Sequence, residues 1–130
     1  MFEVSIEHSF AAGHYLRNYK GKCENPHGHN YKVQVIVRGE KLDDAGLLAD
    51  FVDLKRTLRA VSERLDHVFL NDIEPFTTLN PSAENIAKYI CDQLQEHLPI
   101  KNPVEVAEVK VWETDIQSAT YRPPSTLSSK

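Results

Sequence analysis

Seven residues near the N-terminus, Cys23-Glu-Asn-Pro-His-Gly-His29, place a thiol and two imidazoles at close spacing. Side chains alternate between the two faces of an extended strand, so His27 and His29 project from the same face. A third imidazole, His14, lies thirteen residues before His27, where a strand that folds back would bring it alongside. Three neutral imidazoles with no obvious fourth ligand are typical of a catalytic zinc site with one open position, since structural zinc normally takes four protein ligands.

Two other interpretations of this segment stay open at the level of sequence. His-Gly-His is also compatible with a turn whose rings face solvent, because short motifs have a real false-positive rate. Cys23 is also compatible with a fourth zinc ligand, which would close the site and make it structural. We favour a catalytic thiol for Cys23, since three imidazoles already complete the open-site pattern and a thiolate beside a cation is a good base or nucleophile.

Three further side chains are candidates for proton transfer or ligand binding. Asp66 and His67 follow a predicted helix, where a His at the helix end interacts well with the helix dipole and a catalytic pair is an equally good interpretation. Glu113 continues the apolar stripe of a predicted strand, so its carboxylate requires a partner. That partner is either a basic side chain in a structural salt bridge or the N–H groups of a ligand.

Alternation of apolar and polar residues predicts two strands that position the histidines. Residues 2–10 alternate cleanly, and the small residues at 11–13 favour a bulge or a close backbone approach just before His14. Residues 29–38 also alternate, and the same phase places His27 and His29 on the apolar face of this strand. Imidazoles at the edge of an apolar stripe fit a site with restricted access for water.

Two amphipathic helices follow. Asp50 is a good N-cap for a helix whose apolar residues recur at steps of three and four as far as Leu65. A second helix is predicted to begin at Asn80 or Ser82, with Pro81 in its first turn.

The remaining elements complete an α+β domain. Residues 104–113 form a third strand whose alternation changes phase, which a bulge would reconcile, and a short fourth strand is predicted at 119–121. The order strand, strand, helix, helix, strand, strand predicts an antiparallel sheet with both helices on one face. We expect one domain over residues 1–122 and a disordered tail over 123–130. Four strands leave two open edges, which oligomerisation would cover.

Composition limits the class of protein. The chain has 130 residues, of which 41% are hydrophobic and 26% charged, as in ordinary globular domains. A net charge of −4 lacks the basic footprint of a nucleic-acid-binding protein. No apolar stretch is long enough to span a membrane and no signal peptide is recognisable, so we expect a cytoplasmic protein. Cys23 and Cys91 are expected to be free thiols, with Cys91 buried on a helix stripe.

Five motifs in order resemble those of the 6-pyruvoyltetrahydropterin synthase superfamily, and within it the 6-carboxytetrahydropterin synthases of queuosine biosynthesis. The motifs are Phe10-Ala-Ala-Gly-His14, Cys23-x-x-x-His27-Gly-His29, Leu65-Asp66-His67, Asn80-Pro-Ser-Ala-Glu84-Asn and Val111-Trp-Glu113-Thr114. The resemblance covers about residues 2 to 122. It implies the tunnelling fold, in which ββααββ subunits join their sheets into a barrel, typically a homohexamer of two stacked trimers.

The resemblance also implies a lyase that acts on 7,8-dihydroneopterin triphosphate. His14, His27 and His29 match the zinc ligands, and Cys23 matches the proton-abstracting thiol. The three residues between Cys23 and His27 are similar to the carboxy-forming type, which releases acetaldehyde and triphosphate. The pyruvoyl-forming type has a longer spacer and eliminates triphosphate with all carbons retained, and it is the alternative.

The remaining matches concern proton relay and the pterin ring. His67 with Asp66 matches the proton relay, and Glu113 matches the residue that anchors the pterin and also takes part in that relay. Ser82 and Glu84 fall where the family has pterin-pocket residues. A pterin- or zinc-binding module without catalysis is a further alternative, but ligand binding alone does not require this combination of groups. A structural zinc protein would need four protein ligands and would unfold without its metal.

Overall fold

Two long strands, β1 (Phe2–His14) and β2 (His27–Gly39), form the centre of the sheet in this computed structural model, which describes residues 1–99 and 103–127. They pair antiparallel along their whole length, from Phe2 opposite Gly39 to His14 opposite His27. Both predicted strands are confirmed, and each extends further toward the histidines than the alternation indicated. The register therefore sets His14 directly beside His27.

Strand β4 (Val104–Thr114) pairs antiparallel with β2, and β5 (Gln117–Tyr121) adds a further edge strand. Ile36 lies opposite Glu108 and Val37 opposite Val106, so Ala107 is the extra residue of a bulge. This confirms the bulge that the change of phase predicts. The shift keeps the apolar side chains of β4 on one face over its full length.

The sheet has five strands in the order β3-β1-β2-β4-β5, so the prediction of four antiparallel strands is wrong by one. The additional strand, β3 (Val68–Phe69), runs parallel to β1 and is followed by a short 3-10 helix, η1 (Leu70–Asp72). His67, at φ 57°, turns the chain onto β1, and its backbone N–H donates to Ala11 O at 2.6 Å. Pairing of this kind depends on a local turn and leaves no alternating pattern.

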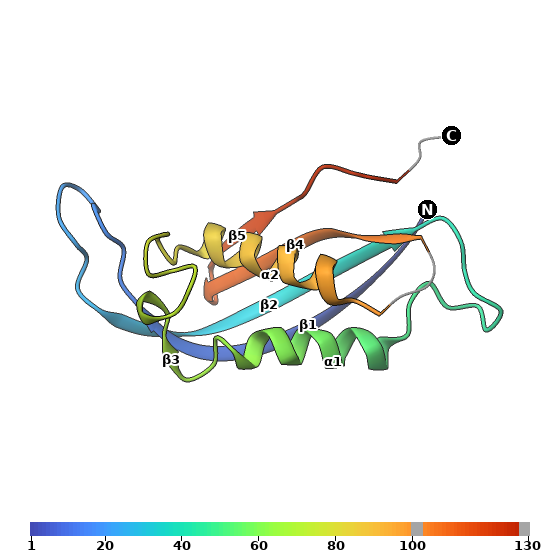
Figure 1. Ribbon diagram of the computed structural model, residues 1–130, viewed down its shortest axis with the longest axis horizontal. Helices are drawn as coiled ribbons and strands as arrows, with labels where there is room; N and C mark the ends of the chain where they lie inside the picture. The colour runs from blue at the N-terminus through green and yellow to red at the C-terminus, as the bar shows by residue number, and fades with distance from the viewer. Residues whose placement is uncertain (100–102, 128–130) are drawn as a thin grey trace.

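Both helices cover the same face of the sheet (Figure 1), as predicted. Helix α1 (Phe51–Glu63) packs on β1, and α2 (Ala83–His97) packs on β4 and β5. The side chain of Asp50 caps α1, as predicted. Ser82 caps α2, so Pro81 precedes the cap and does not lie in the first turn. Neither helix in the described ranges is long and apolar enough to cross a membrane.

The core lies between the helices and the sheet. Most of its fully buried members come from β2, β4 and both helices, and these include Tyr31, Val33, Val35, Leu54, Leu58, Ile86, Ile90, Leu94, Val109 and Val111. At the end of the sheet that carries the histidines, this layer is bounded by the start of α2, by β3 and by the loop of residues 15–26, which projects beyond the strands (Figure 1).

A buried carboxylate joins the residues after β5 to β4. Glu105, only 4% exposed, accepts hydrogen bonds from the Arg38 guanidinium, the Ser125 hydroxyl and the Thr126 backbone N–H. The composition of residues 123–130 indicated a disordered tail and did not predict these contacts. Residues 128–130 lie outside the described residues, and the domain limit at 122 and the disorder of 123–130 stay predictions.

Glu105 should make stability depend on pH. Burial alone raises the pKa of Glu105, but hydrogen bonds from Thr126, Ser125 and Arg38 outweigh burial and lower it overall. The stabilisation is therefore complete above the unfolded pKa of ~4.3 and is lost as pH falls through the folded pKa. We expect Glu105→Gln to lower the free energy of unfolding at pH 7 by roughly 1–3 kcal/mol and to flatten its slope below about pH 5.

Urea unfolding of both proteins between pH 3 and pH 7 measures this effect. Glu108→Gln is the matched control, because Glu108 pairs with Arg122, whose side chain is 70% exposed. Such an exposed pair contributes about 0–1 kcal/mol. Identical pH slopes for Glu105→Gln and the wild type would contradict the assignment.

Candidate metal centre and active site

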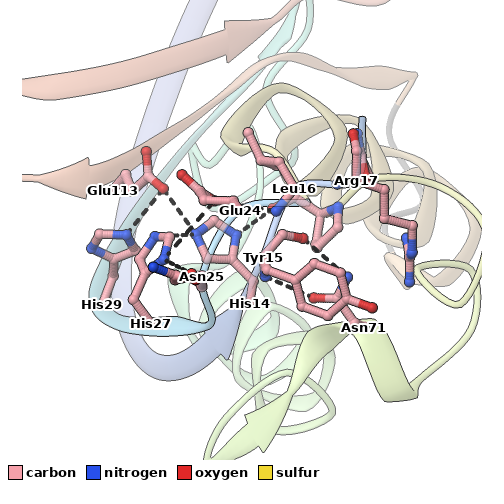
Figure 2. A network of polar contacts seen from close by, with 12 residues as sticks. His14, Tyr15, Leu16, Arg17, Glu24, Asn25, His27, His29, Asn71 and Glu113 are labelled. Carbon is pink, nitrogen blue, oxygen red and sulfur yellow. Dashed lines mark hydrogen bonds and ion pairs between the residues drawn. The ribbon is translucent and has the colours of Figure 1, made fainter. Parts of the chain in front are cut away.

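Four side chains from three strands meet at one end of the sheet (Figure 2). They are His14 at the end of β1, His27 and His29 at the start of β2, and Glu113 near the end of β4, and their ligand atoms all lie within 4.8 Å of one another. His14 Nε2 is 3.1 Å from His27 Nε2 and 3.0 Å from Glu113 Oε1. His29 Nε2 is 3.1 Å from the same carboxylate oxygen.

The three imidazoles predicted to converge are thus brought together by the strand pairing. Their alternation on β2 aims His27 and His29 at the same face, and the antiparallel register adds His14. Glu113 is the fourth member of the group. In the described part of the chain Cys23 does not belong to it, so the geometry gives no support to a site closed by that thiol.

Backbone carbonyls orient two of the rings. His14 Nδ1 lies 2.7 Å from Pro81 O, and His27 Nδ1 lies 2.9 Å from Asn25 O. A carbonyl oxygen only accepts, so each Nδ1 carries the proton and each Nε2 of a neutral ring presents a lone pair. Metal-ligating histidines show this pattern, with one ring nitrogen on the metal and the other on a backbone or carboxylate acceptor.

The base of the group is dry. His14 is 1% exposed, and the ring of the fully buried Tyr31 lies edge-on below His14 and His29, with centroid separations of 5.9 and 5.6 Å. Burial is the main cause that lowers the pKa of His29, and the neighbouring imidazoles act in the same direction while Glu113 opposes them. The neutral ring, which is the form that binds metals, is therefore favoured.

His29 Nε2 supports the same interpretation. This atom is buried and has no hydrogen-bond partner, since its 3.1 Å contact with Glu113 Oε1 lacks hydrogen-bond geometry. A buried polar atom without a partner is costly and calls for an explanation such as an ion. Zinc accepts imidazole nitrogen and carboxylate oxygen as ligands, so the donor set fits this metal.

Asp66 and His67 lie on the β3 side of the site. Asp66 accepts the Ala11 N–H at 2.8 Å and lies 2.9 Å from His67 Nδ1, and these two hydrogen bonds lower the pKa of Asp66. His67 is 81% exposed and lines a cavity of about 440 Å³ together with His29, Phe69 and residues 11–13 and 28–30 of the two central strands. One member of the predicted pair, His67, and one predicted metal ligand, His29, therefore line the same cavity.

Gly13 allows Phe69 of β3 to approach β1 closely. A Cβ atom at Gly13 would lie 3.0 Å from Phe69 Cδ1, which is tighter than ordinary packing. This is the close approach expected from the small residues before His14. Glycine at this position lets β3 lie against β1 and brings His67 to the cavity.

The loop of residues 15–26 carries Cys23, which is exposed. Two asparagines hold the start of this loop as backbone mimics. Asn71 bonds both the N–H and the C=O of Tyr15 at 2.9 and 3.0 Å, and Asn80 does the same for Arg17 at 2.8 and 2.9 Å. Asn71 in η1 and Asn80 before α2 thus fix the path of the chain where the loop begins.

Glu24, beside Cys23, lies next to the metal group without belonging to it, a position that the sequence did not predict. Its carboxylate accepts the Leu16 N–H at 3.1 Å and lies 3.9 Å from His27 Nδ1 (Figure 2). The signal for it was its position three residues before His27. The Arg17 guanidinium donates to the carbonyls of Phe76 and Leu79.

Ser82 and Glu84 stand apart from the histidine group. The Ser82 hydroxyl accepts the Asn85 N–H as the cap of α2, and Glu84 is exposed in the first turn of that helix. The contact between this region and the metal centre runs through the backbone, from Pro81 O to His14. A role of Ser82 and Glu84 in substrate binding stays a prediction.

Comparison with known proteins gives consistent matches over the whole fold. A family model described as 6-pyruvoyl tetrahydropterin synthase matches residues 3–124. The chain is 40% identical to the 6-pyruvoyl tetrahydrobiopterin synthase of Homo sapiens, over 92% of this chain and 90% of the human one. It is 35% identical to the 6-carboxy-5,6,7,8-tetrahydropterin synthase of Bacillus subtilis, over 94% of this chain and 86% of that protein.

A solved structure of a family member has a similar fold. The structure of Caenorhabditis elegans 6-pyruvoyl tetrahydropterin synthase superposes with a TM-score of 0.79 at 32% identity, covering 95% of this chain and 98% of that one. The α+β tunnelling fold predicted from the sequence is thereby confirmed.

Proposed function

The chain belongs to the 6-pyruvoyl tetrahydropterin synthase family and is a lyase, and we propose that it converts 7,8-dihydroneopterin triphosphate to 6-carboxy-5,6,7,8-tetrahydropterin, with release of acetaldehyde and triphosphate, as in queuosine biosynthesis. The observation that carries this proposal is the convergence of three imidazole Nε2 atoms beside the loop that presents Cys23. The three-residue spacer between Cys23 and His27 and the likeness to the Bacillus subtilis protein support the carboxy-forming reaction.

His14, His27 and His29 would hold a zinc ion. When bound, zinc acidifies the substrate hydroxyls that it contacts, as it lowers the pKa of bound water to ~7. The bonds of His14 and His27 to backbone carbonyls keep both Nε2 lone pairs directed at the same point. The dry base formed by Tyr31 keeps bulk water from this side of the site.

Cys23 and His67 would move protons to and from the substrate side chain. His67 Nδ1 is bound to the Asp66 carboxylate, so the exposed Nε2 is the atom that takes up and releases a proton. Asp66 also accepts the Ala11 N–H, which holds it in place as the orienting group. Cys23 would take the proton on the side of the loop.

Glu113 would anchor the pterin ring by accepting from its N–H groups, with Ser82 and Glu84 at the start of α2 completing the pterin pocket. Like the zinc role of the histidines, these roles are part of the proposal. We also infer a cytoplasmic homohexamer of two stacked trimers. The edge strands β3 and β5 support oligomerisation, because they end the sheet.

The second candidate is the pyruvoyl-forming reaction, which eliminates triphosphate and retains all carbons. The specific observation in its favour is the 40% identity to the human protein that carries this name. A pterin-binding protein without catalysis is the third candidate. The three candidates differ in their products, so one assay separates them.

Incubation of the zinc-loaded protein with 7,8-dihydroneopterin triphosphate, followed by assays for triphosphate and for acetaldehyde, is the test. We expect both products in equal amounts and neither after removal of zinc with a chelator. Triphosphate without acetaldehyde would favour the pyruvoyl-forming reaction, and no turnover would favour the binding protein.

A further inference from the structure

Glu113 contacts two of the three imidazoles, and the proposed function also assigns it to the pterin ring. We propose that its carboxylate is the fourth ligand of the metal in the substrate-free protein and leaves the metal when substrate arrives. The first half of this inference rests on the geometry of the four side chains alone. The second half rests also on the proposed function.

The ligand atoms of the four side chains meet with their lone pairs facing one another. Because the Nδ1 atoms of His14 and His27 donate to carbonyls, the Nε2 atoms of the neutral rings are acceptors. Glu113 Oε1 is also an acceptor, yet it lies only 3.0 Å from His14 Nε2, which is itself 3.1 Å from His27 Nε2. Lone pairs that converge in this way repel one another unless a cation lies among them.

The distances from Glu113 to the imidazoles match those between two ligands of one metal ion. Ligands about 2.0–2.1 Å from a tetrahedral ion lie about 3.3 Å from one another. The contacts of 3.0 Å and 3.1 Å from Glu113 Oε1 to His14 and His29 are close to this value. The carboxylate therefore occupies a ligand position and not a more distant one.

The backbone of β4 is irregular at Glu113. Pairing of β4 with β2 ends at Trp112, and the register of β4 with β5 shifts between Trp112 and Thr114. Glu113 thus sits at an irregularity, which commonly re-aims a side chain next to an active site. Its side chain is 27% exposed, compared with 1% for His14. Of the two, Glu113 is the ligand that has room to move.

Coordination number gives a reason for Glu113 to leave. With zinc and substrate bound, three imidazoles and two substrate hydroxyls would already supply five ligands, the expanded number that catalytic zinc sometimes reaches. A retained carboxylate would make six. Departure of Glu113 frees its oxygens to accept from pterin N–H groups, so binding of the ring and opening of the metal would be one event.

Zinc affinity of the substrate-free protein, measured by competition with a chromophoric chelator, tests the ligand role. We expect Glu113→Gln to weaken zinc binding at least tenfold. The matched control is Glu24→Gln, which removes the same charge near His27 from a carboxylate 3.9 Å away that is outside the four-residue group. We expect this control to change the affinity by no more than about threefold. Equal affinities for the wild type and Glu113→Gln would overturn the proposal.

The visible spectrum of the cobalt-substituted protein tests the exchange of ligands, since band intensity reports coordination number and geometry. We expect 7,8-dihydroneopterin to change the wild-type spectrum from four-coordinate to five-coordinate. Before 7,8-dihydroneopterin is added, Glu113→Gln should not show the spectrum of the four-coordinate form in which the carboxylate is a ligand. If Glu113→Gln fails to fold, as judged by circular dichroism, Glu113→Asp withdraws the carboxylate by one methylene and should weaken zinc binding similarly.

These outcomes are independent of turnover. A zinc affinity that depends on Glu113 in a protein without lyase activity would leave the ligand role standing and refute the proposed function. Lyase activity of the wild type, together with a zinc affinity that is unchanged in Glu113→Gln, would refute the ligand role and leave the proposed function standing.

Discussion

Replacing Cys23 with alanine is expected to lower kcat by about 10²–10⁴-fold, the usual contribution of a positioned proton-transfer group. The exposed loop position of Cys23, outside the four-residue metal group, means that zinc binding should change little. Turnover measured as triphosphate release and zinc content measured on the same sample test both statements. Loss of zinc together with activity would show that the thiol is a ligand and not a base.

Cys91 supplies the matched control. This thiol is fully buried in the core, and burial raises its pKa to about 11, so it is inert at neutral pH. We expect Cys91→Ala to keep its activity. Iodoacetamide should inactivate the wild type through Cys23 and should modify Cys91 only after unfolding. Full turnover in Cys23→Ala would refute the catalytic role of Cys23.

The periodic pattern of apolar and polar residues predicted the elements of this fold that have one buried face. Alternation over residues 2–10 and 29–38 identified the two central strands, because one face of each is buried against the helices. The same alternation predicted the face of His27 and His29, since a strand has only two faces. Even the bulge at Ala107 was visible, because an extra residue reverses the phase of the pattern.

Pairing that depends on single residues was not predictable in this way. Strand β3 exists because His67 adopts a left-handed conformation and donates to Ala11, and two residues leave no period to detect. The two asparagines that hold the start of the Cys23 loop act across more than fifty positions, Asn71 on Tyr15 and Asn80 on Arg17. Nothing near them in the sequence indicates these partners.

The partner of Glu113 illustrates the same limit within the site. The apolar stripe of β4 showed that its carboxylate needs a partner, but left a basic residue and a ligand equally possible. Only the register of β4 against β2 brings it to His14 and His29. The sequence therefore specified the types of group at the site, and the strand order specified which of them meet.

Replacing His29 with alanine is expected to weaken zinc binding by more than about 100-fold and to reduce turnover by about 10³-fold or more, because loss of the metal removes several kcal/mol of transition-state stabilisation. His29 is a better choice than His14 for this test. His14 is buried and bound to Pro81 O, so its removal would also disturb the start of α2. The His29 side chain is 19% exposed, and its Nε2 has no hydrogen-bond partner to lose.

His97→Ala is the control, since His97 is exposed at the end of α2 and lies outside the metal group. Zinc titration, turnover and thermal unfolding of the metal-free proteins should be measured in parallel. We expect His29→Ala to unfold at nearly the wild-type temperature without metal, because the fold is held by the core between helices and sheet and not by the ion. Unfolding of the wild type on removal of zinc would instead identify a structural site, and tight zinc binding by His29→Ala would exclude this imidazole as a ligand. Retained folding with lost zinc and lost turnover is the one combination that fits a catalytic metal on a pre-formed sheet.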